Sequence, residues 1–396
     1  MGWIGIIVDQ SSRLENVLFS IFDLRRFITV NVGCSRLLIV IYLLTLCILH
    51  SNPVFANQAC TQPKKPITIL YFRPSDTATS FWGTSDRFAE AVANDLNINL
   101  RTVTIDYEDQ NRFAFSELLK TTLDNLNGPQ PDFIISILYN NAEYSQLSLL
   151  NQYGIPHFTI NTSLDDKTLQ LTGKPRETFP HWKAHMSPNE LLTGQRLVAK
   201  LADAHPAKTM AILAGSTVSA VSKQRVKGAM MAAKALHINA IPAIHTDWTK
   251  NNSIEATKVL IRRVSNFDLL VTVSPLIAEG AVEVISKTNM NVAIGSFDWS
   301  QSNIELMRQG KILFSYGGHF METGWAIALI YDYLNGLDFI NDTGSMIYSE
   351  LGLLDSSNVD KIAPLLVKER WEQIDYKQFS KCANKSLKKY NFTLHN

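Results

Sequence analysis

The sequence has 396 residues, enough for two or three domains of ordinary size. Hydrophobic residues make up 46% of it and charged residues 18%, a balance that excludes an intrinsically disordered chain. The formal net charge is +1, so the chain lacks the strong basic excess typical of nucleic-acid-binding proteins, and we expect no nucleic-acid partner.

The first segment has the pattern of a secretory signal peptide. Arg25 and Arg26 precede an apolar run, Leu37 to Leu49, and Val54 and Ala56 occupy the −3 and −1 positions of a cleavage site. We therefore expect cleavage after Ala56 and a mature protein that is soluble in the periplasm. An uncleaved anchor is the alternative, but the apolar run is short for it because a spanning helix needs about 20 residues.

The cysteines fit an exported protein. Cys34 and Cys47 lie in the leader, so Cys60 and Cys382 remain near the two ends of the mature chain. In an oxidising compartment these two can form one bridge that ties the C-terminal tail to the start of the fold, and we expect that bridge. Two free thiols, or a lipid anchor on Cys60, are the alternatives.

Strand-like and helix-like segments alternate through most of the mature chain. Such alternation predicts parallel sheets built from βαβ units, and therefore an α/β fold. The predicted strands are residues 67–72, 100–105, 132–138, 156–161, 209–215, 239–246, 269–274, 291–298 and 312–317.

These strands are too many for one tidy sheet. The first four fit one doubly wound lobe and the rest a second, joined by a hinge. The polar, proline-containing stretch 162–188 is expected to separate them. Ligands of such sheets bind at the carboxyl ends of the strands, and two facing lobes would place those ends across one cleft.

Flat aromatic and hydrogen-bonding side chains follow the predicted strand ends. A sugar ring has apolar C–H faces that pack on an aromatic plane, and hydroxyls that need hydrogen-bond partners in a closed cleft. We therefore expect a sugar or similar polyol to bind among them. The candidate ligand-binding residues are Phe81, Trp82, Asn161, Arg225, Trp248, Ser274, Asp298 and His319.

Several of these side chains also have a simpler interpretation. A core position is the alternative for Phe81, a solvated helix face for Arg225 and a packing or rim position for His319. Asn161 can be a turn residue, and Asp298 can cap the helix that follows it. The interpretation as a site depends on their joint placement at strand ends.

Six segments, in this order, resemble the type I periplasmic binding proteins, the two-lobed family that includes ribose and galactose receptors. The resemblance covers about Lys65 to Leu366. The segments are "SFWGTSDRFAEAV", "YGIPHFTIN", "SKQRVKGAMMAA", "LLVTVSPLIAEGAVEVI", "VAIGSFD" and "GKILFSYGGHFMETGWAIALIYDYLNG".

The resemblance implies roles for individual residues. Phe81 and Trp82 match the paired aromatics that stack on the sugar, and Trp248 matches an aromatic of the second lobe. Arg225 matches the arginine of an R-x-x-G pattern, and Asp298 matches the acid after the G-F-D strand.

Some positions depart from the family pattern. Asn161 stands where an Asp is frequent and Ser274 where an Asn is frequent. The hydroxyl pattern that this chain recognises is therefore not expected to be that of ribose.

The resemblance also implies an organisation and a function. The expected parts are a signal peptide at 1–56, an N-terminal lobe of 65–186 plus 319–345, a C-terminal lobe of 187–318 plus 346–374 and a tail at 375–396. The protein is then a monomeric receptor, without cofactor or metal, whose lobes close on the ligand and which delivers it to a membrane ABC permease.

One subgroup is closer still. The segment 80–100 resembles that of the autoinducer-2 receptor, which partners a membrane sensor kinase, and Trp82, Asn161 and Arg225 match its ligand contacts. However, its second cleft arginine falls at Gly318, which makes autoinducer-2 itself a poor ligand candidate. A receptor that presents its occupancy to a sensor kinase or chemoreceptor is the alternative function.

Motifs of catalysis are missing from the sequence. We find no G-x-S-x-G, H-E-x-x-H, P-loop or G-x-G-x-x-G pattern, so we expect no enzyme. A transcription regulator of the same fold would need a helix-turn-helix and a basic N-terminus, where this chain has a signal peptide.

Overall fold

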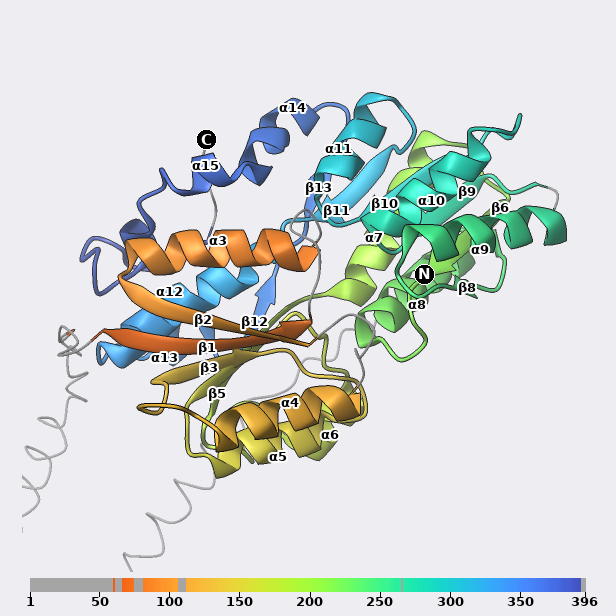
Figure 1. Ribbon diagram of the computed structural model, residues 1–396. Coiled ribbons are helices and arrows are strands. Elements are labelled where there is room, and N and C mark those ends of the chain that lie inside the picture. Colours follow the sequence, from red (N-terminus) through yellow and green to blue (C-terminus); the bar gives the residue numbers. More distant parts are fainter. Residues whose placement is uncertain (1–59, 61–65, 75–80, 106–111, 265, 393–396) are drawn as a thin grey trace, which may run out of the picture. The chain divides into compact units, whose positions relative to one another are not determined.

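A computed structural model gives the architecture of the chain (Figure 1). It divides the chain into residues 1–58 and 59–396, and the predicted signal peptide, with its cleavage after Ala56, lies outside the described residues. The described residues are 60, 66–74, 81–105, 112–264 and 266–392. They form two sheets with helices on their faces, which confirms the predicted α/β class with two parallel-sheet halves.

The first sheet has six strands within the described residues, and all of its pairs are parallel. Ile69 of the strand next to one edge lies opposite Leu100 on one side and Phe133 on the other. From edge to edge the strands are β12 (Met346–Ser349), β5 (Trp182–Pro188), β4 (His157–Ile160), β3 (Phe133–Ser136), β1 (Ile67–Pro74) and β2 (Ile98–Ile105).

Helices cover both faces of this sheet, as a parallel sheet requires. In Figure 1, α3 (Phe81–Asp95) lies on one side, and α4 (Arg112–Asp124), α5 (Glu143–Gln152) and α6 (Asp166–Thr172) lie on the other. A later helix, α12 (Glu322–Leu334), packs against α3. A Cβ on Gly324 of α12 would lie 2.5 Å from the Phe88 ring of α3, so a glycine there lets the two helices approach.

The second sheet has seven strands within the described residues, six of them along one path. In order they are β13 (Gly352–Leu354), β11 (Phe314–Gly317), β10 (Ala293–Phe297), β9 (Leu269–Thr272), β6 (Thr209–Ala214) and β7 (Asn239–Ala240), with β8 (Ile244–His245) also paired to β6. Only β13 pairs in the antiparallel sense among these strands.

Two layers of helices enclose the second sheet. On one face, Leu197 packs in the same core cluster as Phe297, and on the other Leu260 packs with Ile294. The first layer is α7 (Glu190–Ala204) and α8 (Ala220–Ala235). The second is α9 (Lys250–Arg263), α10 (Pro275–Ile285) and α11 (Gln301–Arg308).

The chain passes between the two sheets after β5, after β11 and after β12. The predicted boundary at 345/346 is therefore wrong, because β12 pairs with β5 of the first sheet and the crossing comes only after Ser349. The boundary at 186/187 is likewise displaced, since β5 runs to Pro188. The short elements near the last two crossings are η3 (His319–Met321), α13 (Ile340–Thr343), α14 (Val359–Ile362), η4 (Ala363–Leu366), α15 (Lys368–Trp371) and η5 (Tyr376–Phe379).

The stretch 162–188, predicted to separate the lobes, contains a strand of the first sheet. β5 looks polar in the sequence because it contains His185 and Ser187. Both are buried, and both have hydrogen-bond partners. His185 bonds to the hydroxyls of Thr159 (2.8 Å) and Ser187 (3.1 Å). Burial lowers the pKa of His185 to about 3, so the ring is neutral and a buried position is tolerated.

The predicted strand 239–246 forms two short strands instead of one. β7 and β8 each contain two residues, and Pro242 lies between them. A proline has no N–H to donate to a neighbouring strand, so the ladder is interrupted there.

The C-terminal segment is part of the first core, not a separate tail at 375–396. Trp371 and Tyr376 meet Phe88 of α3 edge to face, with centroids 5.6 and 5.7 Å apart. Phe392 stacks on Trp325 of α12 at 5.2 Å. A disulfide joins Cys60 to Cys382, so the structure places the bridge where the sequence suggested it.

None of the helices in the described ranges is long and apolar enough to cross a membrane.

Asp332 anchors this C-terminal segment. Its carboxylate is fully buried and accepts hydrogen bonds from the backbone N–H groups of Lys381 (2.7 Å) and Cys382 (3.1 Å) and from the hydroxyl of Tyr390 (2.7 Å). An Asn cannot accept all of these bonds, because one of its two terminal atoms is a donor.

We predict that Asp332→Asn lowers the free energy of unfolding by about 1.5–3 kcal/mol, the range for hydrogen bonds to a charged group. Urea denaturation monitored by circular dichroism measures it. Asp360→Asn is the matched control, since Asp360 is 82% exposed. Equal stability of the two variants would contradict the role of Asp332.

Candidate functional site

A cavity of about 670 Å³ opens where the carboxyl ends of strands from both sheets meet. Its position is the one expected for parallel α/β sheets, whose strand ends and following loops form ligand sites. All eight candidate ligand-binding residues line it. They are Phe81, Trp82, Asn161, Arg225, Trp248, Ser274, Asp298 and His319.

The first sheet contributes two aromatic rings at the start of α3. Phe81 and Trp82 meet edge to face, with centroids 4.9 Å apart and planes at 84°. Phe81 also lies against His319, at 4.6 Å between centroids. Phe81 is therefore held between two rings, and both aromatics are half-buried in the cavity wall.

The second sheet contributes Trp248, which follows β8. A Cβ on Gly215 would lie 2.3 Å from the Trp248 ring, so only glycine leaves room for the indole over the end of β6. The backbone of Trp248 has φ 74°, in the left-handed region that bulky residues rarely adopt.

Two more residues of the cavity wall share this unusual backbone. Asn161 after β4 and Asp298 after β10 both have φ 67°. Asn and Asp adopt this region more readily than other non-glycine residues, because their short polar side chains can hydrogen-bond locally. Here the turn aims each side chain from a strand end into the cavity.

Arg225 is held by partners on three elements. Its Nε and Nη2 donate to the two carboxylate oxygens of Glu190 (2.7 and 2.8 Å), and Nη1 donates to the carbonyl of Val273 (2.8 Å). Nη2 also donates to Asp298 Oδ1 (3.2 Å). A guanidinium has five N–H donors, so most of them are committed within the protein. The Arg225 guanidinium therefore helps to hold Asp298 in place.

Asp298 and His319 lie side by side at the buried end of the cavity. His319 Nε2 is 3.5 Å from Asp298 Oδ1. Burial lowers the pKa of His319 well below its usual value, and the Arg225 guanidinium lowers it further, so the ring is neutral. Burial raises the pKa of Asp298, against the opposing effect of Arg225.

Three buried polar atoms of the cavity wall have no hydrogen-bond partner among the described residues: Tyr139 OH, Ser274 Oγ and His319 Nδ1. A buried polar group without a partner costs about 1–3 kcal/mol, so such groups are uncommon in folded proteins. The residues that carry these three atoms line one cavity, and a few polar side chains in a largely apolar cavity are typical of small-molecule sites.

Glu322 lies at the junction where chain segments cross between the sheets. Its fully buried carboxylate accepts from the backbone N–H of Asn161 (3.0 Å) and from the hydroxyl of Ser349. Burial raises the pKa of Glu322 well above 4.5, and the nearby Glu190 raises it further. No Lys or Arg bonds to Glu322 among the described residues.

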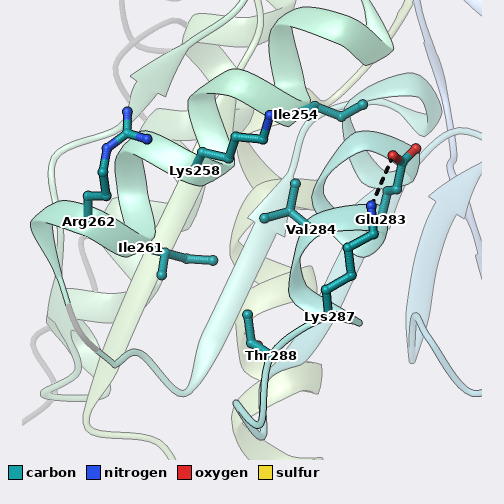
Figure 2. A pocket seen from close by; sticks show the side chains of 8 residues that line it. All are labelled: Ile254, Lys258, Ile261, Arg262, Glu283, Val284, Lys287 and Thr288. Atoms are coloured by element: carbon teal, nitrogen blue, oxygen red, sulfur yellow. Dashed lines mark hydrogen bonds and ion pairs between the residues drawn. The ribbon is translucent and has the colours of Figure 1, made fainter.

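A second hollow, of about 360 Å³, lies between α9 and α10, away from the strand ends. Figure 2 shows Lys258, Arg262 and Lys287 around Ile261 and Val284, with Glu283 paired to Lys287 (3.4 Å). It contains none of the candidate residues, so the cavity between the sheets is the better site. Among the described residues, no three His, Cys, Asp or Glu side chains gather as metal ligands.

The model of the periplasmic binding protein domain matches residues 69–338. The chain belongs to this family. The predicted resemblance to type I periplasmic binding proteins is thereby confirmed, whereas that to the autoinducer-2 receptor is not. No curated protein sequence matches the chain.

Solved structures of the same fold are distant in sequence. A periplasmic sugar-binding protein from Pseudomonas fluorescens has 17% identity and a TM-score of 0.70, over 80% of this chain and 95% of that one. An ABC transporter solute-binding protein from Actinobacillus succinogenes with bound D-allose has 19% identity and a TM-score of 0.64, over 75% and 100%. A carbohydrate transporter from Acidothermus cellulolyticus in complex with myo-inositol has 16% identity and a TM-score of 0.65, over 78% of this chain and 100% of that one.

Several residues in or behind the cavity wall were not predicted from the sequence. Glu190 has the position of an ordinary acidic residue in the first turn of a helix, so nothing in the sequence marked it as the partner of Arg225. Glu322 is likewise an acidic residue in the first turn of a helix, so no local pattern marked it either. Tyr139 follows a predicted strand end and fitted the rule used for the others.

Glu322 gives a pH prediction. Because its pKa is higher in the folded than in the unfolded protein, the folded state binds the extra proton and stability falls as pH rises above about 4.5. Glu322→Gln keeps an acceptor for the N–H of Asn161 and places a donor beside Ser349. The variant should gain in melting temperature over the parent as pH rises from about 4 to about 7.

Differential scanning calorimetry at each pH measures that gain. Glu350→Gln is the control, because the Glu350 side chain is 82% exposed, and its difference in melting temperature from the parent should not change with pH. A pH-independent difference for Glu322→Gln would contradict a neutral buried carboxyl.

Proposed function

We propose that this chain is a periplasmic solute-binding protein that captures a sugar or sugar-like polyol and delivers it to a membrane ABC permease. One observation carries the proposal. Aromatic rings and side chains that carry unpartnered buried polar atoms line the same cavity of about 670 Å³. That volume lies within the range typical of small-molecule sites.

The chemistry of the cavity suits a polyol. Trp82 and Trp248 offer flat faces to the C–H surfaces of a sugar ring, with little loss of side-chain freedom. Hydroxyls of the ligand would bond to Ser274 Oγ and His319 Nδ1, which relieves two unpartnered groups. Asp298 Oδ2 has no bond among the described residues and can accept from a further hydroxyl.

Capture would proceed by closure of the two halves on the ligand. Trp82 belongs to the first sheet's side of the cavity and Trp248 to the second's, so a ligand that contacts both stabilises the closed arrangement. A permease can then distinguish the loaded from the empty protein by the relative orientation of the halves. The solved relatives with D-allose and myo-inositol support a polyol as the ligand class.

The proposed place of action is the periplasm, with the chain as a monomer. The family and the signal-peptide pattern of residues 1–56 support export, and the Cys60–Cys382 disulfide fits an oxidising compartment. No observation on the site favours the alternative of a sensory receptor, so transport is the function that we propose.

A thermal-shift screen of neutral sugars and cyclitols tests the proposal. A ligand at 100 times its dissociation constant adds about 2.7 kcal/mol to the stability of the folded protein, which raises the melting temperature by several degrees. No response to a broad panel would contradict the proposed ligand class.

Trp82→Ala should weaken the binding of any responding sugar at least about tenfold, because it removes one stacking face. Isothermal titration calorimetry measures the affinity, and circular dichroism checks the fold. Tyr348→Ala is the control, since Tyr348 is 68% exposed and outside the cavity. Unchanged affinity in Trp82→Ala would place the binding site elsewhere.

A further inference from the structure

The walls of the cavity carry an excess of negative charge. Four carboxylates line it, from Asp247, Glu279, Asp298 and Glu305, and Arg225 is the sole Lys or Arg among its described lining residues. The Arg225 guanidinium is already committed to Glu190 and Asp298. A cleft with walls of one sign concentrates ligands of the opposite charge and repels those of the same charge.

The sequence that joins two of the lining residues contains no Lys or Arg. Pro74 and Phe81 both line the cavity, and the sequence between them, "SDTATS", contains one acid and no Lys or Arg. These six residues therefore contain no positive charge that could offset the carboxylates of the described lining residues.

Helix N-termini could in principle favour an anion, since their free N–H groups point at the strand-end cavity. At two helices beside the cavity a side chain caps the first turn. Ser219 accepts from the N–H of Ser222 at the start of α8, and Ser300 accepts from the N–H of Asn303 at the start of α11. α10 begins with Pro275, which has no N–H to offer. Each cap occupies one N–H of its helix and α10 lacks the N–H of its first residue, so the attraction of these three helix starts for an anion is reduced.

Glu279 is the carboxylate best placed to receive a cation. It lies on the second turn of α10, lines the cavity and is half-buried, and it makes no hydrogen bond or ion pair with any described residue. Glu283, one turn further along α10, does not line the cavity and pairs with Lys250 (3.2 Å). It also pairs with Lys287, as Figure 2 shows.

The same cavity contains side chains that can bind a positively charged ligand. Trp82, Tyr139 and Trp248 present aromatic rings, whose faces attract cations. The unpartnered Ser274 Oγ and His319 Nδ1, both in side chains more than nine-tenths buried, mark it as a built site and not merely as an acidic surface.

We infer that the cavity selects polyols by charge, an inference that rests on the proposed function. It binds an amine-bearing polyol more tightly than the neutral parent and excludes carboxylated and phosphorylated polyols. Glu279 receives the ammonium group. The cavity contacts the hydroxyls and the ring faces of the amine-bearing polyol as it does those of a neutral sugar. The positive charge of the amine makes the amine-bearing polyol bind more tightly.

Isothermal titration calorimetry with matched hexoses tests this inference. The probes are glucose, galactose and mannose, their 2-amino counterparts, and glucuronate, galacturonate and glucose 6-phosphate. For at least one pair the amino sugar should bind about tenfold tighter than its parent, which corresponds to about 1.4 kcal/mol. The preference should shrink in high salt, and the anionic sugars should not bind.

Glu279→Gln should reduce the ratio of the two affinities to about twofold or less, because it removes the charge and keeps the shape. Glu283→Gln changes the same charge on the same helix outside the cavity and should keep the ratio. An unchanged ratio in Glu279→Gln would overturn the role given to this residue.

The panel of probes distinguishes a failure of charge selection from a failure of sugar binding. Binding of a neutral parent as tightly as its amino counterpart, or binding of an anionic sugar, would overturn the charge selection and leave the sugar-binding function standing. Binding of no probe would count against both.

Discussion

The Arg225 guanidinium is buried in the second half of the fold, and a buried charge must have partners nearby. Glu190 at the start of α7, the carbonyl of Val273 after β9 and Asp298 after β10 supply them. Removal of one partner from such a group costs about 3–5 kcal/mol, so the arrangement is strongly specified. The position of Asp298 in the cavity, and with it the polar end of the site, depends on this one ion network.

The rest of the site is arranged around strained strand ends. Asn161, Trp248 and Asp298 have left-handed backbone conformations, and each turns a side chain into the cavity. Gly215 makes room for Trp248, as shown by the 2.3 Å approach that a Cβ would make. Buried unpartnered atoms and an excess of carboxylates complete a cavity suited to a hydroxylated ligand without negative charge.

The sequence predicted the parts of the fold that follow from simple periodicity. Apolar runs indicated the strands correctly where both faces are buried in apolar layers, and residues after those strands reached one cavity because parallel strands end on one edge. β5 was missed because its polar His185 is satisfied inside the core. Glu190 was missed because its meaning depends on Arg225, 35 positions away, which no local pattern encodes.

The central claim is that a polyol binds between the aromatic faces of the two halves. The most direct measurement is a crystal structure of the protein saturated with the tightest-binding sugar of the panel. The account predicts electron density for one ring in contact with Trp82 and Trp248, with a ligand hydroxyl on Ser274 Oγ. Density for the sugar outside this cavity, for example between α9 and α10, would contradict the account.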